Sequence, residues 1–101
     1  MAKGYWIAHV SVNDPTAYEE YRKRNGVAFA KYNARFLVRG GPHEIVEGNL
    51  RSRHVIVEFP SYEAALECYR SPEYAEAMRY RTPVSEGDFV IIEGYDGPQP
   101  G

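Results

Sequence analysis

The stretch Arg53–Tyr74, RHVIVEFPSYEAALECYRSPEY, decides the fold. Its first residues are rich in β-branched side chains and predict a strand, which Pro60 ends because the proline ring has no N–H to donate to a sheet. Ser61 is a typical N-cap, so a helix is expected to begin there. Ser71 and Pro72 repeat a cap followed by proline, which breaks this helix and starts another. The stretch therefore predicts a strand followed by a helix in two parts.

The rest of the chain supplies the partners of these elements. Alternating apolar residues predict strands over residues 4–12, 35–39, 52–59 and 88–94, and helical spacing predicts a helix from Pro15 to about residue 32. Residues 43–47 are expected to form a short extended piece. The order βαββαβ predicts an α+β ferredoxin-like fold, a four-stranded antiparallel sheet with the helices on one face. We expect residues 1–95 to form this single domain and residues 96–101, rich in glycine and proline, to form a flexible C-terminal tail.

The two faces of the predicted sheet differ. One face is mixed, since it carries charged residues beside large aliphatic ones. Exposed apolar patches usually mark an interface. We expect a second copy of the chain to cover that face in a symmetric homodimer, the alternative being a monomer with an apolar sheet surface. The wholly apolar face, which should lie under the helices, is formed by Trp6, Ala8, Val10, Phe36, Val38, Val55, Val57, Phe59, Val90 and Ile92.

Composition narrows the classes of partner. The chain has 101 residues, a net charge of -2 and 44% hydrophobic residues, as in an ordinary single globular domain. It lacks the basic surplus that nucleic-acid binding requires, and no apolar run is long enough to span a membrane. We therefore expect neither nucleic acid nor membrane as a partner, and a cytoplasmic location. The single Cys68 agrees with a reducing compartment because it has no partner for an internal disulfide.

Fragments throughout the ordered chain form one pattern, which comprises Gly4-Tyr5, Asp14, Tyr18, Tyr21, Arg39-Gly40-Gly41, Glu47-Gly48, the Arg53 strand into Glu58-Phe59-Pro60-Ser61, Ala64-Ala65, Tyr69, Ser71-Pro72-Glu73-Tyr74, Arg81 and Glu93-Gly94. Together these fragments resemble a known family, the domain-of-unknown-function family 1330 of the dimeric α/β barrel superfamily. The resemblance implies the ferredoxin-like fold and a dimeric barrel, but no established activity. Members of the wider superfamily include cofactor-free monooxygenases, isomerases and haem-binding enzymes, which is an analogy of fold alone. Two departures from the family pattern are Asn33-Ala34, in place of a glycine pair, and Cys68, in place of a tryptophan.

Two residues are candidates for catalysis. Arg39 precedes Gly40 and Gly41, which let the backbone approach a bound group, and its guanidinium suits a carboxylate, phosphate or enolate oxygen. Glu58 has an apolar neighbour on each side and could act as a general base if its pKa were raised. The structural alternative is that Arg39 pairs with Glu47 or Glu58, and that Glu58 is held in an ion pair with Arg39, Arg53 or Arg81.

Other residues point to binding. Seven tyrosines in the predicted helices either pack in the core or wall a cleft for a small aromatic or enol-like ligand. His54 and Glu58 are roughly 13 Å apart on a strand, too far to share a metal, so neither a metal nor a cofactor is expected. We expect a homodimer that binds a small organic molecule, with proton-transfer or cofactor-free oxygen chemistry as one alternative and a non-catalytic sensor or structural module as the other. The expected ligand contacts are Arg39, Gly40, Gly41, Arg53, Tyr69, Tyr74 and Arg81.

Overall fold

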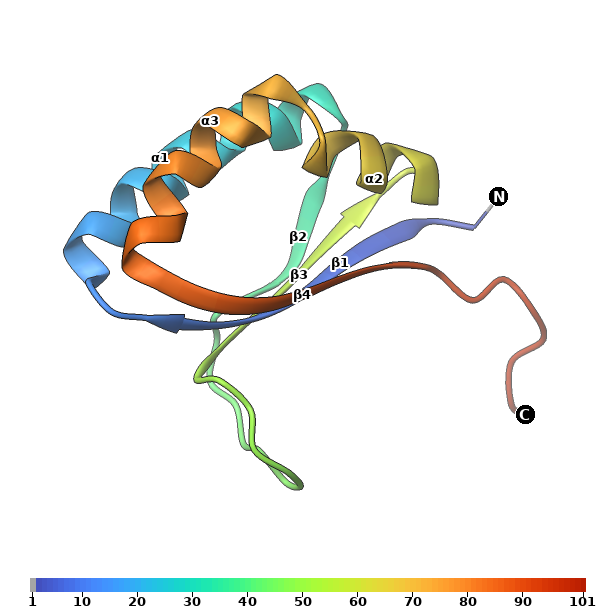
Figure 1. Cartoon of the computed structure of the whole chain (residues 1–101). Helices are drawn as coiled ribbons and strands as arrows, with labels where there is room; N and C mark the ends of the chain where they lie inside the picture. Colours follow the sequence, from blue (N-terminus) through green and yellow to red (C-terminus); the bar gives the residue numbers. More distant parts are fainter. Residues whose placement is uncertain (1) are drawn as a thin grey trace.

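The computed structural model describes residues 2–101, so Met1, the first residue of the expected domain, lies outside the described residues. The sheet has the order β2-β3-β1-β4, and every neighbouring pair is antiparallel. The helices lie over one face and leave the other bare (Figure 1). This arrangement confirms the ferredoxin-like α+β fold. Its elements are β1 (Gly4–Val12), α1 (Pro15–Lys31), β2 (Arg35–Arg39), β3 (Arg53–Phe59), α2 (Tyr62–Tyr69), α3 (Pro72–Arg81), a 3₁₀ turn (Thr82–Val84) and β4 (Ser85–Glu93).

The helices begin at the residues that the sequence marks. The side chains of Asp14, Ser61 and Ser71 each accept a hydrogen bond from the backbone N–H three residues further on, at 3.1 Å. Pro15 and Pro72 occupy the first turns of α1 and α3, where a missing N–H removes no helical hydrogen bond. Local chemistry therefore accounts for all three starts.

Trp6 is the centre of the core. Its ring lies edge-on to Phe29 and Tyr74, with centroids 5.2 and 4.8 Å away, and beside Phe59 at 5.2 Å. Its indole N–H donates to the carbonyl of Ala65 at 2.8 Å, so the one polar atom of the ring is satisfied. Trp6 thereby fixes α2 on the sheet.

The prediction of which β4 side chains face the helices was wrong, because the alternation is shifted by one residue. Phe89 and Ile91 pair with Ala8 and Trp6 of β1 and pack against the core, whereas Val90 and Ile92 are about half exposed on the outer face. Both alternations along this strand are apolar, so the pattern alone does not choose between them. The strand also begins at Ser85, three residues earlier than expected.

A β-bulge reverses the end of β2. Phe36 lies opposite Val57 on the helix face, but Val38 lies opposite Ile56 and Arg39 opposite Val55. The extra residue turns Val38 to the outer face, against the prediction, and turns Arg39 toward the helices. A register shift of one residue thus moves the candidate arginine to the covered side of the sheet.

Residues 40–52, here called the arm, join β2 to β3 without any helix or strand, so the expected extended piece at 43–47 does not form a strand. The arm projects from the sheet on the side away from the helices (Figure 1). Within residues 2–101, no helix is long and apolar enough to cross a membrane.

Candidate functional site

A small cavity lies between α1 and the helix face of the sheet. Its volume is about 30 Å³, room for roughly two water molecules. Aromatic rings of Trp6, Phe29 and Phe36 form part of its wall. The polar side chains that line it are Arg22, Asn25, Arg39 and Arg53, together with the hydroxyl-bearing Tyr18 and Tyr21.

One face of α1 supplies four of these residues. Tyr18, Tyr21, Arg22 and Asn25 follow the i, i+3, i+4, i+7 spacing that places side chains on one side of a helix. The Tyr21 hydroxyl bonds the hydroxyl of Tyr74 at 2.7 Å, and burial raises the pKa of Tyr21. Asn25 was not among the expected site residues. A polar residue on an otherwise buried helical stripe is the signal that could have identified it.

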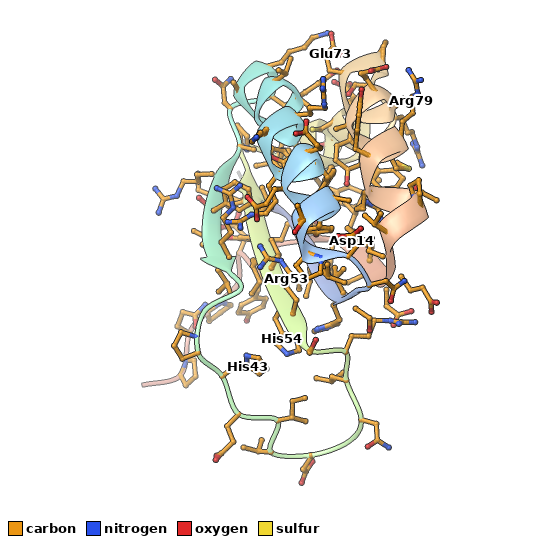
Figure 2. The ribbon with its side chains drawn as sticks, turned by 90° about the vertical axis from the view of Figure 1, so that its left-hand side faces the viewer. Asp14, His43, Arg53, His54, Glu73 and Arg79 are labelled. Atoms are coloured by element: carbon orange, nitrogen blue, oxygen red, sulfur yellow. The ribbon has the colours of Figure 1, made fainter. Side chains whose placement is uncertain are left out.

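Arg39 and Arg53 come from the strands. Arg53 lies opposite Val10 of β1, whose side chain is buried on the helix face, and Figure 2 shows Arg53 between the sheet and α1. Gly40 adopts a φ of +68°, and a Cβ there would lie only 2.9 Å from Cζ of Arg53. The glycine therefore makes room for the Arg53 guanidinium, while the bulge before it directs Arg39 to the same side.

The site carries uncompensated positive charge. Arg22 pairs with Glu19 at 2.8 Å, but across residues 2–101 neither Arg39 nor Arg53 has a carboxylate oxygen within 4.0 Å. The Arg39 guanidinium lies 4.1 Å from the Phe36 ring centroid. Partial burial, and then the positive charges of Arg22 and Arg53, lower the pKa of Arg39. An anion at this point would relieve the repulsion.

Three buried polar atoms around the cavity lack a hydrogen-bond partner among the described residues. They are Nε of Arg22, Nε of Arg53 and Oδ1 of Asn25, a residue only 5% exposed. Leaving such a group unpaired costs about 1–3 kcal/mol. The two arginine nitrogens suit a bound group that presents an acceptor, whereas Asn25 Oδ1 requires a donor, which a carboxylate lacks and a water beside it can supply.

Glu58 lies on the other face of the sheet. Its carboxylate accepts a hydrogen bond from the Tyr5 hydroxyl at 3.0 Å and pairs with Arg35 at 3.4 Å. The bond to Glu58 raises the pKa of Tyr5. Because Arg39 faces the helices, the sheet separates the two expected catalytic residues. They cannot act on one ligand within a subunit, and the ion-pair partner of Glu58 is none of the three arginines considered from the sequence.

The remaining expected contacts lie outside the cavity wall. Tyr74 is fully buried, and its ring centroid and that of Tyr69 lie 4.8 and 5.5 Å from Trp6, so both pack in the core. Arg81 is buried with its guanidinium 4.3 Å from the Phe89 ring centroid. Gly41 faces open space. Of the seven predicted contacts, the structure brings Arg39 and Arg53 together at the cavity, with Gly40 beside them.

The three histidines gather where the arm meets the outer face. Nδ1 of His9 and Nδ1 of His54 are 2.9 Å apart, and the ring centroids of His43 and His54 are 4.4 Å apart (Figure 2). Burial, and then the neighbouring imidazoles, lower the pKa of His54. Within the described chain, no three His, Cys, Asp or Glu side chains converge in a way that would hold a metal ion.

The fold and the cavity define a ferredoxin-like α+β protein with a cationic pocket between a helix and the sheet. The model of the family described as domain of unknown function DUF1330 matches residues 3–95, and the chain belongs to this family. Among curated proteins, none matches the chain.

Solved structures share the fold at low sequence identity. A protein of unknown function from Rhodopseudomonas palustris is 19% identical over 95% of this chain and 85% of its own, with a TM-score of 0.73. SnoaB, a cofactor-independent oxygenase from Streptomyces nogalater, is 12% identical over 99% of this chain and 97% of its own, with a TM-score of 0.64. A dimeric protein of unknown function and ferredoxin-like fold from Bacteroides fragilis is 13% identical over 90% and 95%, with a TM-score of 0.60.

Proposed function

We propose that this protein binds a small organic anion, a carboxylate or enolate, in the cavity between α1 and the sheet. The observation that carries the proposal is the pair Arg39 and Arg53, two guanidiniums directed to one cavity with no carboxylate partner among residues 2–101. Arginine binds planar oxyanions through two parallel hydrogen bonds, which favours a carboxylate over a spherical ion. The unpaired Nε of Arg53 supplies one such donor.

The size and wall of the cavity refine the ligand. The cavity has room for roughly two waters, so it can hold a carboxylate group without any rearrangement. A larger apolar body requires a lining side chain to swing outward, and Arg39 is the more exposed of the two arginines. The aromatic wall favours an apolar or aromatic body behind the anionic group.

Calorimetry with benzoate and with neutral benzyl alcohol tests this proposal. We expect benzoate to bind and Arg53→Met to weaken it by about tenfold or more, because a charged hydrogen bond contributes about 1.5–3 kcal/mol. Arg79→Met is the matched control, since Arg79 is an exposed cation paired with Glu76 on α3. Glu58→Gln should also leave binding unchanged. Equal affinity of Arg53→Met and the unaltered protein for benzoate would refute the site.

The second part of the proposal is a homodimer formed through the outer face of the sheet. Leu37, Val38, Val90 and Ile92 are all more than a third exposed on that face, which no helix covers. The Bacteroides fragilis protein with this fold is described as dimeric. Burial of aliphatic side chains on both edge strands would stabilise a second copy there. Sedimentation equilibrium tests it, and a monomer at every concentration examined would refute it.

Cofactor-free oxygen chemistry is the second candidate, because the positive field of Arg39 and Arg53 would favour the ionised form of an enol or phenol. The SnoaB neighbour is a cofactor-independent oxygenase with this fold. Among the described residues, however, neither a carboxylate nor an imidazole lines the cavity, so no side chain is placed there as a strong base. A non-catalytic ligand-binding module therefore fits the site better. Oxygen consumption with an ionisable phenol would favour the oxygenase instead.

A further inference from the structure

The arm, residues 40–52, exposes large aliphatic side chains far from the core. Val46 is 80% exposed, and Ile45 and Leu50 are 40% and 50% exposed. Figure 1 shows the arm extending from the sheet on the side that carries no helix. Isolated aliphatic residues are common on surfaces, but three exposed ones within one projecting segment are typical of an interface.

Both ends of the arm are fixed to the sheet. At the first end, the Gly40 N–H donates to the carbonyl of His54 at 2.9 Å, and the His43 ring lies against that of His54 (Figure 2). At the other end, Arg51 donates to Asp88 at 3.0 Å and to Ser11 at 3.1 Å. These contacts hold the arm at a defined angle to the sheet.

The subunit is flat, and the arm projects from one side of it. The Cα atoms extend over 44 × 35 × 17 Å, and the radius of gyration is 14.2 Å. A compact chain of this length has a value of about 13 Å, so the subunit is flatter and more extended than a filled sphere. The outer face, with Leu37, Val38, Val90 and Ile92, is exposed on the same side of the sheet as the arm.

We propose that the arm is a clasp that closes over a second copy of this chain, with Ile45, Val46 and Leu50 packing on the partner. The inference rests on the homodimer proposed above and goes beyond it, because sheet packing alone would leave these side chains in water. A two-fold axis would apply the contact twice, since each subunit offers the same arm and the same outer face. An apolar arm beside an apolar face on one side of the subunit is self-complementary, which favours a second copy over an unrelated partner.

Single aspartate substitutions and sedimentation equilibrium test the clasp. We expect Val46→Asp and Leu50→Asp each to raise the dimer dissociation constant by about tenfold or more. Each substitution places one charge per subunit, and so two per dimer, in an apolar contact. Val27→Asp is the matched control, because Val27 is 64% exposed but lies on α1, over the opposite face of the sheet. Val90→Asp reports on the sheet interface itself. Far-UV circular dichroism confirms that each variant folds.

The outcomes separate the clasp from the dimer. Weakening by Val46→Asp and Val90→Asp, with Val27→Asp unchanged, supports the clasp. If Val90→Asp weakens the dimer while both arm variants associate like the unaltered chain, the dimer is right and the clasp is wrong. If the unaltered chain is monomeric throughout, both the dimer and the clasp are wrong.

Discussion

Replacing Gly40 by alanine should damage both the stability of the protein and its anion site. Gly40 has a φ of +68°, and an L residue in this left-handed region costs about 1–2 kcal/mol relative to glycine. A loss of 1 kcal/mol lowers the melting temperature of a domain of this size by about 4–8 °C. The added Cβ would also overlap the Arg53 guanidinium, because Cζ would lie only 2.9 Å away. Arg53 would have to leave its position beside the cavity.

Two other glycines separate these effects. Gly48 has a φ of +79° with nothing within 4 Å of an added Cβ, so Gly48→Ala should show the backbone cost alone. Gly41 has neither a positive φ nor a neighbour within 4 Å, so Gly41→Ala should change little.

Thermal unfolding and benzoate calorimetry provide the readouts. We expect Gly40→Ala and Gly48→Ala to lose similar stability, because both bear the backbone cost and the Arg53 guanidinium is the movable end of a flexible side chain, and Gly41→Ala to change little. Only Gly40→Ala should weaken benzoate binding, by about tenfold or more, because a displaced Arg53 forfeits a charged hydrogen bond. The reasoning fails if Gly40→Ala and Gly48→Ala bind benzoate alike.

Three further predictions concern Cys68, Tyr74 and His54. Burial raises the pKa of Cys68 to about 12. The native protein should therefore resist a thiol reagent at mildly alkaline pH and react only on unfolding. Rapid reaction of the native protein would contradict the burial of Cys68. Tyr74→Phe leaves the buried Tyr21 hydroxyl without its partner and should cost about 1–3 kcal/mol in denaturant unfolding, whereas no loss would mean that Tyr21 finds another hydrogen-bond partner. The pKa of His54 is lowered in the folded chain, so below about pH 6.5 the unfolded state binds more protons and stability should fall. His54→Gln should flatten this fall, and an unchanged pH profile would exclude His54 as its source.

Local sequence signals predicted the structure best where a single residue acts on its immediate neighbours. Ser61 and Ser71 start α2 and α3 by accepting a backbone hydrogen bond within one turn, and Pro72 occupies the first turn of α3, all as predicted. The apolar alternation of β1 also placed Trp6 under the helices correctly, because only one of its two faces is wholly apolar.

Which side chains line the site depends on the register of the strands, and the local alternation of residues does not determine that register. The bulge between Phe36 and Val38 moves Arg39 to the helix face, and nothing in the alternation of residues 35–39 requires it. The same kind of ambiguity reversed the faces of β4. Glu58 followed its strand's alternation as expected, so the shift of Arg39 alone placed the two expected catalytic residues on opposite faces of the sheet.

The sequence by itself determined the order of elements, the ferredoxin-like fold and the family, since caps, prolines and strand alternation act over a few residues. Only the tertiary structure decided which charged side chains meet. Arg39, Arg53 and Asn25 converge because a bulge, a glycine with a positive φ and a helical stripe each direct one of them to the same space. Such convergence depends on contacts between segments distant in the chain, and these are set by packing and register across the whole sheet.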